Sequence, residues 1–198
     1  MKRVHYTDSY LMNPQHPVTV NIIGAGGTGS QVLTCMARLD VTLRTLGHPG
    51  LFVTLYDPDT MTEANIGRQL FSPSELGLNK ALCLVKRINY FFGNTQTAGQ
   101  VVLGTVPKKI RQPASGQYET VGSLKVITRF VKYARVKEED SGPSCSLAEA
   151  LEKQDLFINS TLAQFGCNIL WKMFRNVMLE HHGLFLNLET MKVNPIVI

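Results

Sequence analysis

Four glycines between an apolar run and an amphipathic stretch have the spacing of a phosphate-binding turn. The segment reads IIGAGGTGS, with the glycines at Gly24, Gly26, Gly27 and Gly29. In such a turn the first glycine permits a tight bend, the second lets the backbone approach a phosphate, and the last lets the next helix pack closely. The N–H groups at the start of that helix would then face the phosphates.

The elements on either side of this turn must position it. The apolar and β-branched run at 18–23 suits a strand buried on both faces. The stretch from Ser30 to about Leu46 has apolar residues at helical spacing and stops at GHPG, a turn signal. A second strand at 51–56 ends on Asp57, which is placed to accept hydrogen bonds from a ribose hydroxyl. These features predict a nucleotide-binding α/β domain, and by themselves they leave the nucleotide open.

Three further motifs follow Asp57 in order: a D-x-D, an N-x-x-R-Q and a G-x-x-K-A. Their polar residues are Asp57 and Asp59, then Asn65, Arg68 and Gln69, then Lys80. Together with the glycine turn, these motifs closely resemble the ThiF/MoeB family, the bacterial branch of the ubiquitin-activating-enzyme-like adenylating enzymes. The resemblance covers about the first ninety residues. Basic side chains suit this chemistry, because attack of a carboxylate on the α-phosphate of ATP brings two anions together.

The resemblance implies a Rossmann-like, mostly parallel sheet flanked by helices. It also implies a cytoplasmic homodimer that uses ATP and Mg²⁺ to adenylate the C-terminal carboxylate of a small ubiquitin-like β-grasp protein. The four glycines would pack against the nucleotide, Asp57 would hold its ribose, and Asp59 would join it or support the metal. Asn65, Arg68 and Gln69 would reach the triphosphate, with Arg68 stabilising charge on the α-phosphate. Lys80 would bind phosphate oxygens and help pyrophosphate leave.

A third feature is Cys145, which follows a polar stretch and precedes SLAEALE. Ser146 and Glu149 form a capping box, so a helix is expected to begin there, and its dipole would favour the Cys145 thiolate. In ubiquitin-activating relatives a catalytic cysteine lies in such a crossover loop, here about 137–145, so a thioester on Cys145 is one interpretation. A loop cysteine without chemistry is the other. The motifs between 57 and 81, together with the segment 144–164, look most like the ThiF-related member of the ParB-related, ThiF-related plasmid cassette.

One β–α unit of the family pattern has no counterpart. Between Asn94 and Val101 there are only a few polar residues, whereas another unit needs about 30. The metal-binding Asp of the family lies on that unit, so the metal ligand is left unassigned. Either the chain has lost this β–α unit, or a segment after Asn94 has been left out and the flanking residues joined. We expect the second. We interpret residues 1–198 as one adenylation domain, with a nucleotide-binding half at 1–94 and a C-terminal half at 95–198.

Composition excludes several other classes. The hydrophobic fraction is 44%, the charged fraction 18% and the net charge +5, as in ordinary globular proteins. Basic residues between 108 and 137 have no interleaved aromatics, which favours a solvated face over a nucleic-acid surface. The N-terminus has no signal-peptide pattern and no apolar run approaches a membrane span. The four cysteines contain no C-x-x-C pair; three of them are expected within helices as core thiols.

The remaining elements are expected as follows. Residues 1–17 form an irregular lead-in, and 97–107 and 124–130 form strands. One helix is expected to begin at Ser146, with apolar residues at helical spacing through Leu170, and to end at His181 and His182. This helix is preferred over a strand at 155–161. Closing strands follow at 184–188 and 195–198.

Two other functions share the glycine turn. A nicotinamide-dependent oxidoreductase would have no use for Arg68, Gln69 and Lys80. A nucleotide-binding scaffold without catalysis is favoured by the missing metal-binding acid.

Overall fold

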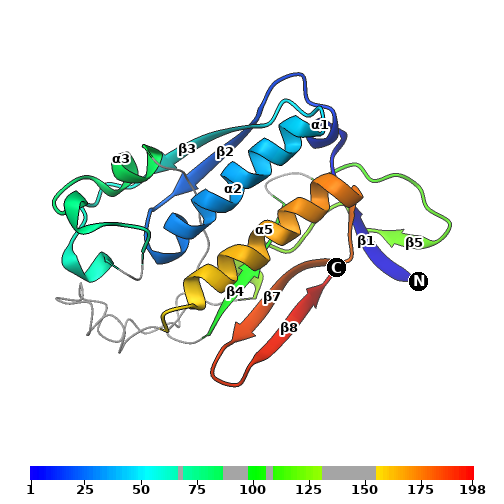
Figure 1. The fold of residues 1–198 in the computed structure, drawn as a ribbon. Helices are drawn as coiled ribbons and strands as arrows, with labels where there is room; N and C mark the ends of the chain where they lie inside the picture. Colours follow the sequence, from blue (N-terminus) through cyan, green and yellow to red (C-terminus); the bar gives the residue numbers. More distant parts are fainter. Residues whose placement is uncertain (67–68, 87–97, 106–108, 131–154) are drawn as a thin grey trace.

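The segment that contains the glycine turn is built on one β–α–β unit (Figure 1). The computed structural model describes residues 1–66, 69–86, 98–105, 109–130 and 155–198. Strand β2 (Val18–Ile23) leads into helix α2 (Gly27–Thr45), and strand β3 (Leu51–Tyr56) returns parallel to β2. The register runs from Val18 opposite Leu51 to Ile23 opposite Tyr56, so the two strands end together. This unit confirms the predicted Rossmann-like α/β fold.

The prediction that β2 is buried on both faces is wrong. Val18 and Ile22 are buried beneath α2, whereas Ile23 is 81% exposed. On β3, Phe52 and Tyr56 are also exposed. The physical reason is that burial alternates along both strands, so the apolar core covers only one face of this two-stranded sheet.

The segment after β3 contains short helical turns and little regular structure. Two 3₁₀ turns, Glu63–Asn65 and Pro73–Glu75, precede the short helix α3 (Lys80–Val85). Each 3₁₀ turn is closed by a capping box, so its backbone N–H groups have partners without a longer helix. This segment therefore holds its polar residues at the ends of β2 and β3.

The other described strands form two three-stranded sheets. One sheet has the order β4 (Ala98–Val102), β7 (His181–Asn187), β8 (Lys192–Val197). The other has β1 (Lys2–Tyr6) between β5 (Tyr118–Thr120) and β6 (Met178–Leu179). Parallel pairing is thus found at β2–β3 and β1–β5, and the other described strand pairs are antiparallel.

Helix α5 (Ile158–Asn176) connects these parts (Figure 1). Ala163 joins the apolar core between α2 and the β2–β3 sheet. Ile158 and Leu162 pack with residues of β4 and β7, and Met173 packs with Leu179 near the chain end. One helix therefore contributes to all three apolar clusters, because its apolar residues occur on more than one side.

Several predicted boundaries are wrong. Residues 1–17 are not irregular, since they contain β1 and a short helix α1 (Ser9–Met12). Residues 124–130 form a 3₁₀ turn, Ile127–Arg129, in place of a strand. The expected helix start at Ser146 lies outside the described residues, and the helix seen here begins only at Ile158 after a turn. Residues 158–161 are helical, which agrees with rejecting a strand there.

The predicted end of the long helix is also wrong. Helix α5 ends at Asn176, followed by Val177 with a left-handed φ of 60°. His181, His182 and Gly183 therefore lie in strand β7, where His181 pairs with β8, Gly183 pairs with β8 and β4, and the register shifts between them. The closing strands begin three residues earlier than predicted and end one residue earlier, at Asn187 and Val197.

Buried His182 gives a testable pH dependence. Its Nδ1–H donates to the Leu103 carbonyl oxygen at 2.7 Å. Burial lowers the pKa of His182, and the charges of Lys125 and His5 act in the same direction, while the Leu103 carbonyl opposes them. The folded pKa is below the unfolded value, so the unfolded chain binds more protons as pH falls.

We therefore expect the neutral His182 to contribute stability above about pH 6.5, which is lost as pH falls through the folded pKa. Urea unfolding near pH 7 and near pH 5 would measure it, with His182→Gln compared with the wild type. Exposed His16→Gln is the matched control. An unchanged pH dependence in His182→Gln would assign the acid sensitivity to other groups.

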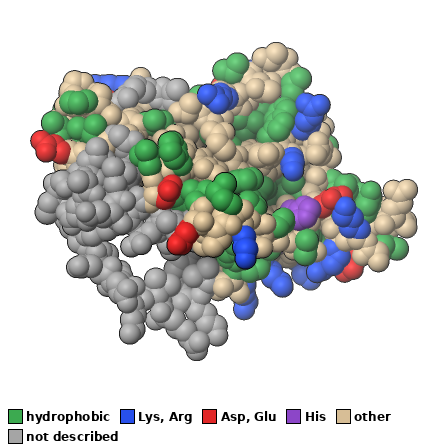
Figure 2. Space-filling view, turned by 60° about the horizontal axis from the view of Figure 1, so that its bottom comes forward, with side chains coloured by type: hydrophobic (Ala, Val, Ile, Leu, Met, Phe, Trp, Pro, Cys, Tyr) green, Lys and Arg blue, Asp and Glu red, His purple; other side chains and the backbone are tan. Residues whose placement is uncertain are grey.

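The surface shows where charge lies. Figure 2 shows Lys and Arg side chains around a histidine, on the side where Figure 1 places β1 and β5. Lys109, Arg111, Lys125 and Arg129 are exposed, and the solvated role of this basic face stays a prediction. Over the described ranges, no helix combines the length and apolarity needed to cross a membrane.

Candidate functional site

The glycine turn forms the first wall of the site. Gly24 has φ 94°, which a side chain would strain, and its N–H donates to the Tyr56 carbonyl oxygen. Gly26 caps α2 without a side-chain hydrogen bond, and a Cβ placed there would meet nothing within 4 Å. The first turn of α2 has no acidic residue. This helix start is therefore open toward an anion and carries the favourable end of the dipole.

Asp57 ties the end of β3 to the turn. Its carboxylate accepts hydrogen bonds from the N–H groups of Ala25 and Asp59. The Asn79 amide donates to the carbonyl oxygens of Asp57 and Asp59. Asp57 thus lies beside the glycine turn, where the sequence predicted a ribose ligand, and a ribose hydroxyl would compete with Ala25 for its oxygens.

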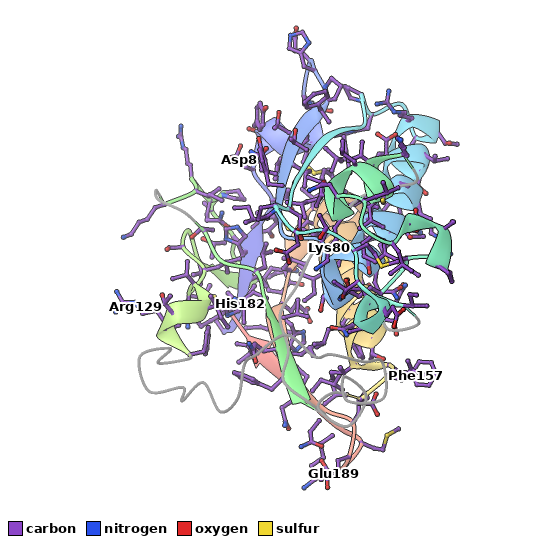
Figure 3. All side chains as sticks on the ribbon, turned by 90° about the vertical axis from the view of Figure 1, so that its left-hand side faces the viewer. Asp8, Lys80, Arg129, Phe157, His182 and Glu189 are labelled. Atoms are coloured by element: carbon purple, nitrogen blue, oxygen red, sulfur yellow. The ribbon has the colours of Figure 1, made fainter. Side chains whose placement is uncertain are left out.

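Lys80 reaches the same edge from α3. Its Nζ is 3.0 Å from the Asp59 Oδ2, and its side chain is only 10% exposed, whereas that of Asp59 is 65% exposed. The Lys80 N–H also donates to the Asp59 carbonyl oxygen, and Asn79 caps α3. Figure 3 looks toward the ends of β2 and β3, with Lys80 labelled among the surrounding loops. A buried stem and a fixed partner hold this ammonium in place.

The N-x-x-R-Q segment is attached to the start of α2. Ser30 Oγ donates to the Gly27 carbonyl oxygen and accepts from the Leu70 N–H, both at 3.1 Å. Asn65 Oδ1 accepts from the Thr62 N–H and hydroxyl, so this oxygen maintains the local turn. Ser30 was not singled out from the sequence, although its place at the helix start was a usable signal.

Gln69 is buried, and its Oε1 has no hydrogen-bond partner in the part of the chain that the structure describes. An amide oxygen accepts hydrogen bonds, so its natural partner is a hydroxyl or amino group and not a phosphate oxygen. Arg68 and Cys145 lie outside the described residues, and their predicted roles stay predictions.

Helix α5 also contacts the glycine turn. Thr28 Oγ1 donates to Asn159 Oδ1 of α5 at 2.7 Å, and both residues are buried. A Cβ on Gly27 would lie 2.4 Å from Asn159 Nδ2. The glycine at 27 is therefore needed for contact with α5, which the sequence spacing alone did not reveal.

This contact predicts a stability difference between neighbouring glycines. Gly27→Ala should lower the free energy of unfolding by about 1–3 kcal/mol, because α5 or Asn159 must move. Gly26→Ala should cost little, since its Cβ meets open space. Urea unfolding of both variants would test this, and Asn159→Ser should relieve much of the Gly27→Ala penalty. Equal stability of the two alanine variants would contradict the close contact.

The residues fit ATP with Mg²⁺ in part. An open helix start, a ribose-placed carboxylate and a positioned lysine are the groups that a nucleoside triphosphate requires. Magnesium in phosphate sites commonly uses one or two carboxylates, with substrate oxygens and water completing its shell. Asp59 can supply one carboxylate, and the described residues contain no cluster of three acidic, His or Cys side chains.

The β2–α2–β3 unit with its glycine turn defines a Rossmann-like α/β domain. The model of the ThiF family matches residues 15–108, slightly less than half of the chain, so this segment is similar to the ThiF family. At the family level these are E1-like adenylating enzymes that use ATP with Mg²⁺ and generally act with ubiquitin-like β-grasp proteins. Comparisons with curated proteins and with solved structures gave no match.

Proposed function

We propose that this protein activates the C-terminal carboxylate of a small β-grasp protein by ATP-dependent adenylation. The supporting observation is the contact series from the glycine turn through Asp57 and Asp59 to Lys80. It brings a phosphate-binding helix start and a nearly buried ammonium to one sheet edge. A nicotinamide dinucleotide would use the turn and Asp57 but has no triphosphate for Lys80.

In this proposal Asp57 exchanges its bond to Ala25 for bonds to the ribose hydroxyls. The N–H groups at the start of α2 bind phosphate oxygens. Lys80 transfers its contact from Asp59 to the phosphates, which frees the Asp59 carboxylate to hold Mg²⁺. The metal would offset triphosphate charge when bound.

The reaction that we propose is a displacement at the α-phosphorus. A carboxylate oxygen of the β-grasp protein forms the new bond to phosphorus, and the bond to the bridging oxygen of pyrophosphate breaks. Lys80 and Arg68 would stabilise the negative charge on the transferring and leaving groups. Capture of the acyl group by Cys145, with release of AMP, is the thioester step that could follow.

The cassette resemblance motivates a more specific proposal for the partner. We propose that the carrier is the small ubiquitin-like protein of the ParB-related, ThiF-related cassette and that the enzyme acts as a homodimer. Titrating that protein into this one, followed by calorimetry and size-exclusion chromatography, would test both points. Absence of binding in the presence of ATP would exclude this small ubiquitin-like protein as the carrier.

Nucleotide selectivity tests the proposal without a carrier. ATP with Mg²⁺ should raise the melting temperature, because a ligand at about 100 times its Kd adds about 2.7 kcal/mol to stability. NADH at equal concentration should raise it less. A larger shift with NADH would favour the oxidoreductase, and ATP binding without any pyrophosphate exchange would favour the scaffold.

A further inference from the structure

A pocket lies between α2 and α5, away from the glycine turn. It has a volume of about 500 Å³. Each helix supplies four residues at helical spacing: Cys35, Arg38, Leu39 and Thr42 from α2, and Gln164, Cys167, Asn168 and Trp171 from α5. Two free thiols, one from each helix, thus face one pocket.

The two thiols differ in their surroundings. A hydrogen bond from Cys167 lowers the pKa of Cys35 to about 7, opposed by burial and assisted by Arg38 and Gln164. The same contact with Cys35, together with burial, raises the pKa of Cys167. Cys35 therefore loses its proton more readily than Cys167, which is its hydrogen-bond donor. Cys83 is a buried thiol outside this pocket and provides a natural control.

We propose that Cys35 and Cys167 form a thiol–disulfide exchange site that takes a small carboxylate-bearing disulfide into the α2–α5 pocket. The volume suits a small-molecule site, Arg38 offers a partner for a carboxylate, and Trp171 offers an apolar wall. Both sulfur-bearing side chains line this pocket, and the Cys167 thiol is a hydrogen-bond partner of Cys35, so the two sulfur atoms are already neighbours.

The exchange proceeds in two balanced steps. The Cys35 thiolate attacks one sulfur of the small disulfide, which forms a mixed disulfide and releases one small thiolate. Cys35 is then uncharged, so the main cause of the high pKa of Cys167 is gone, and the released thiolate accepts its proton. The Cys167 sulfur attacks Cys35, the second small thiolate leaves and takes up a proton, and a Cys35–Cys167 disulfide remains. Two protein thiols are oxidised and one small disulfide is reduced to two thiols.

The product would join α2 to α5 covalently. Asn159, two turns before Cys167 on α5, contacts Thr28 at the glycine turn. The cross-link should therefore restrain the contact between Asn159 and Thr28 at the glycine turn. This inference does not depend on adenylation, and its test does not measure that activity.

Oxidised glutathione is the probe, and the intact chain is followed by mass spectrometry with peptide mapping. Within this pair, a glutathione adduct should appear first on Cys35, followed by a peptide cross-linked between Cys35 and Cys167, and the peptide map scores any adduct on Cys145 separately. The rate should rise with pH to a midpoint near pH 7, compared with about 8.5 for an ordinary thiol. Cys167→Ser should stop at the adduct, Cys35→Ser should prevent both products at this pair, and Cys83→Ser should react like the wild type.

Two further results decide the proposal if a cysteine variant unfolds. In the wild type, a first adduct on Cys167, or no cross-link after Cys35 has reacted, would overturn it. Arg38→Gln should slow the reaction with oxidised glutathione several-fold more than the reaction with neutral hydroxyethyl disulfide, because only the first carries carboxylates. Equal slowing would overturn the carboxylate selectivity.

Discussion

Lys80→Met is expected to reduce carrier-dependent ATP–pyrophosphate exchange by about 100-fold, the usual effect of removing one group that stabilises transition-state charge. Methionine keeps the buried stem, while the ammonium that contacts Asp59 is lost. Asp59 is largely exposed, so water can solvate its carboxylate and the fold should remain.

Lys86→Met is the matched control for this variant. Lys86 directly follows α3 and is exposed, without a described partner in an ion pair. Its exchange rate should equal that of the wild type. If Lys80→Met also exchanges normally while remaining folded, the Lys80–Asp59 pair is structural and takes no part in phosphate chemistry.

Gly26→Val is expected to weaken ATP binding by about tenfold or more, because side-chain atoms would occupy the space where the turn approaches a phosphate. The expected loss in stability is small, since a Cβ at Gly26 meets no protein atom within 4 Å. Calorimetric titration with ATP and Mg²⁺ would measure binding, and urea unfolding would measure stability.

Gly116→Val controls for the substitution itself. Gly116 also faces open space and has no positive φ, and it is remote in sequence from the glycine turn. Its ATP affinity should be unchanged. Normal ATP affinity in Gly26→Val would place the phosphates elsewhere and would contradict the glycine turn as the binding loop.

The sequence predicted the β2–α2–β3 unit well because its signals are local. An apolar run, a glycine turn and the GHPG stop define the elements without reference to distant residues, and Gly47 and Gly50 do adopt positive φ. The end of α5 has no such signal. It stops before Val177, a β-branched residue in a left-handed conformation that sequence patterns disfavour.

The late start of the described helix has a local explanation that periodicity misses. The Asp155 side chain accepts the Phe157 N–H at 2.8 Å, which stabilises a turn before Ile158. Strand β1 was missed because its partners, β5 and β6, are far away in the sequence. Its first residues, Lys2 and Arg3, are charged and give a weak strand pattern.

The candidate site was predictable as a set of motifs but not as a set of contacts. The motifs placed Asp57, Asp59 and Lys80 near a nucleotide, and the structure adds that Lys80 is paired with Asp59. The contact of Gly27 with Asn159 and the meeting of Cys35 with Cys167 depend on how α5 packs against α2. Such packing cannot be inferred from residues that are more than a hundred positions apart.

Pyrophosphate exchange into ATP tests the central proposal most directly. The reaction would contain this protein, ATP, Mg²⁺, labelled pyrophosphate and the small ubiquitin-like protein of the proposed cassette. Exchange should require that protein with a free C-terminal carboxylate and should disappear when the carboxylate is an amide, because only the acid can attack the α-phosphorus. Equal exchange with the amide, or no exchange by a folded protein that binds both ATP and the carrier, would contradict carboxylate adenylation.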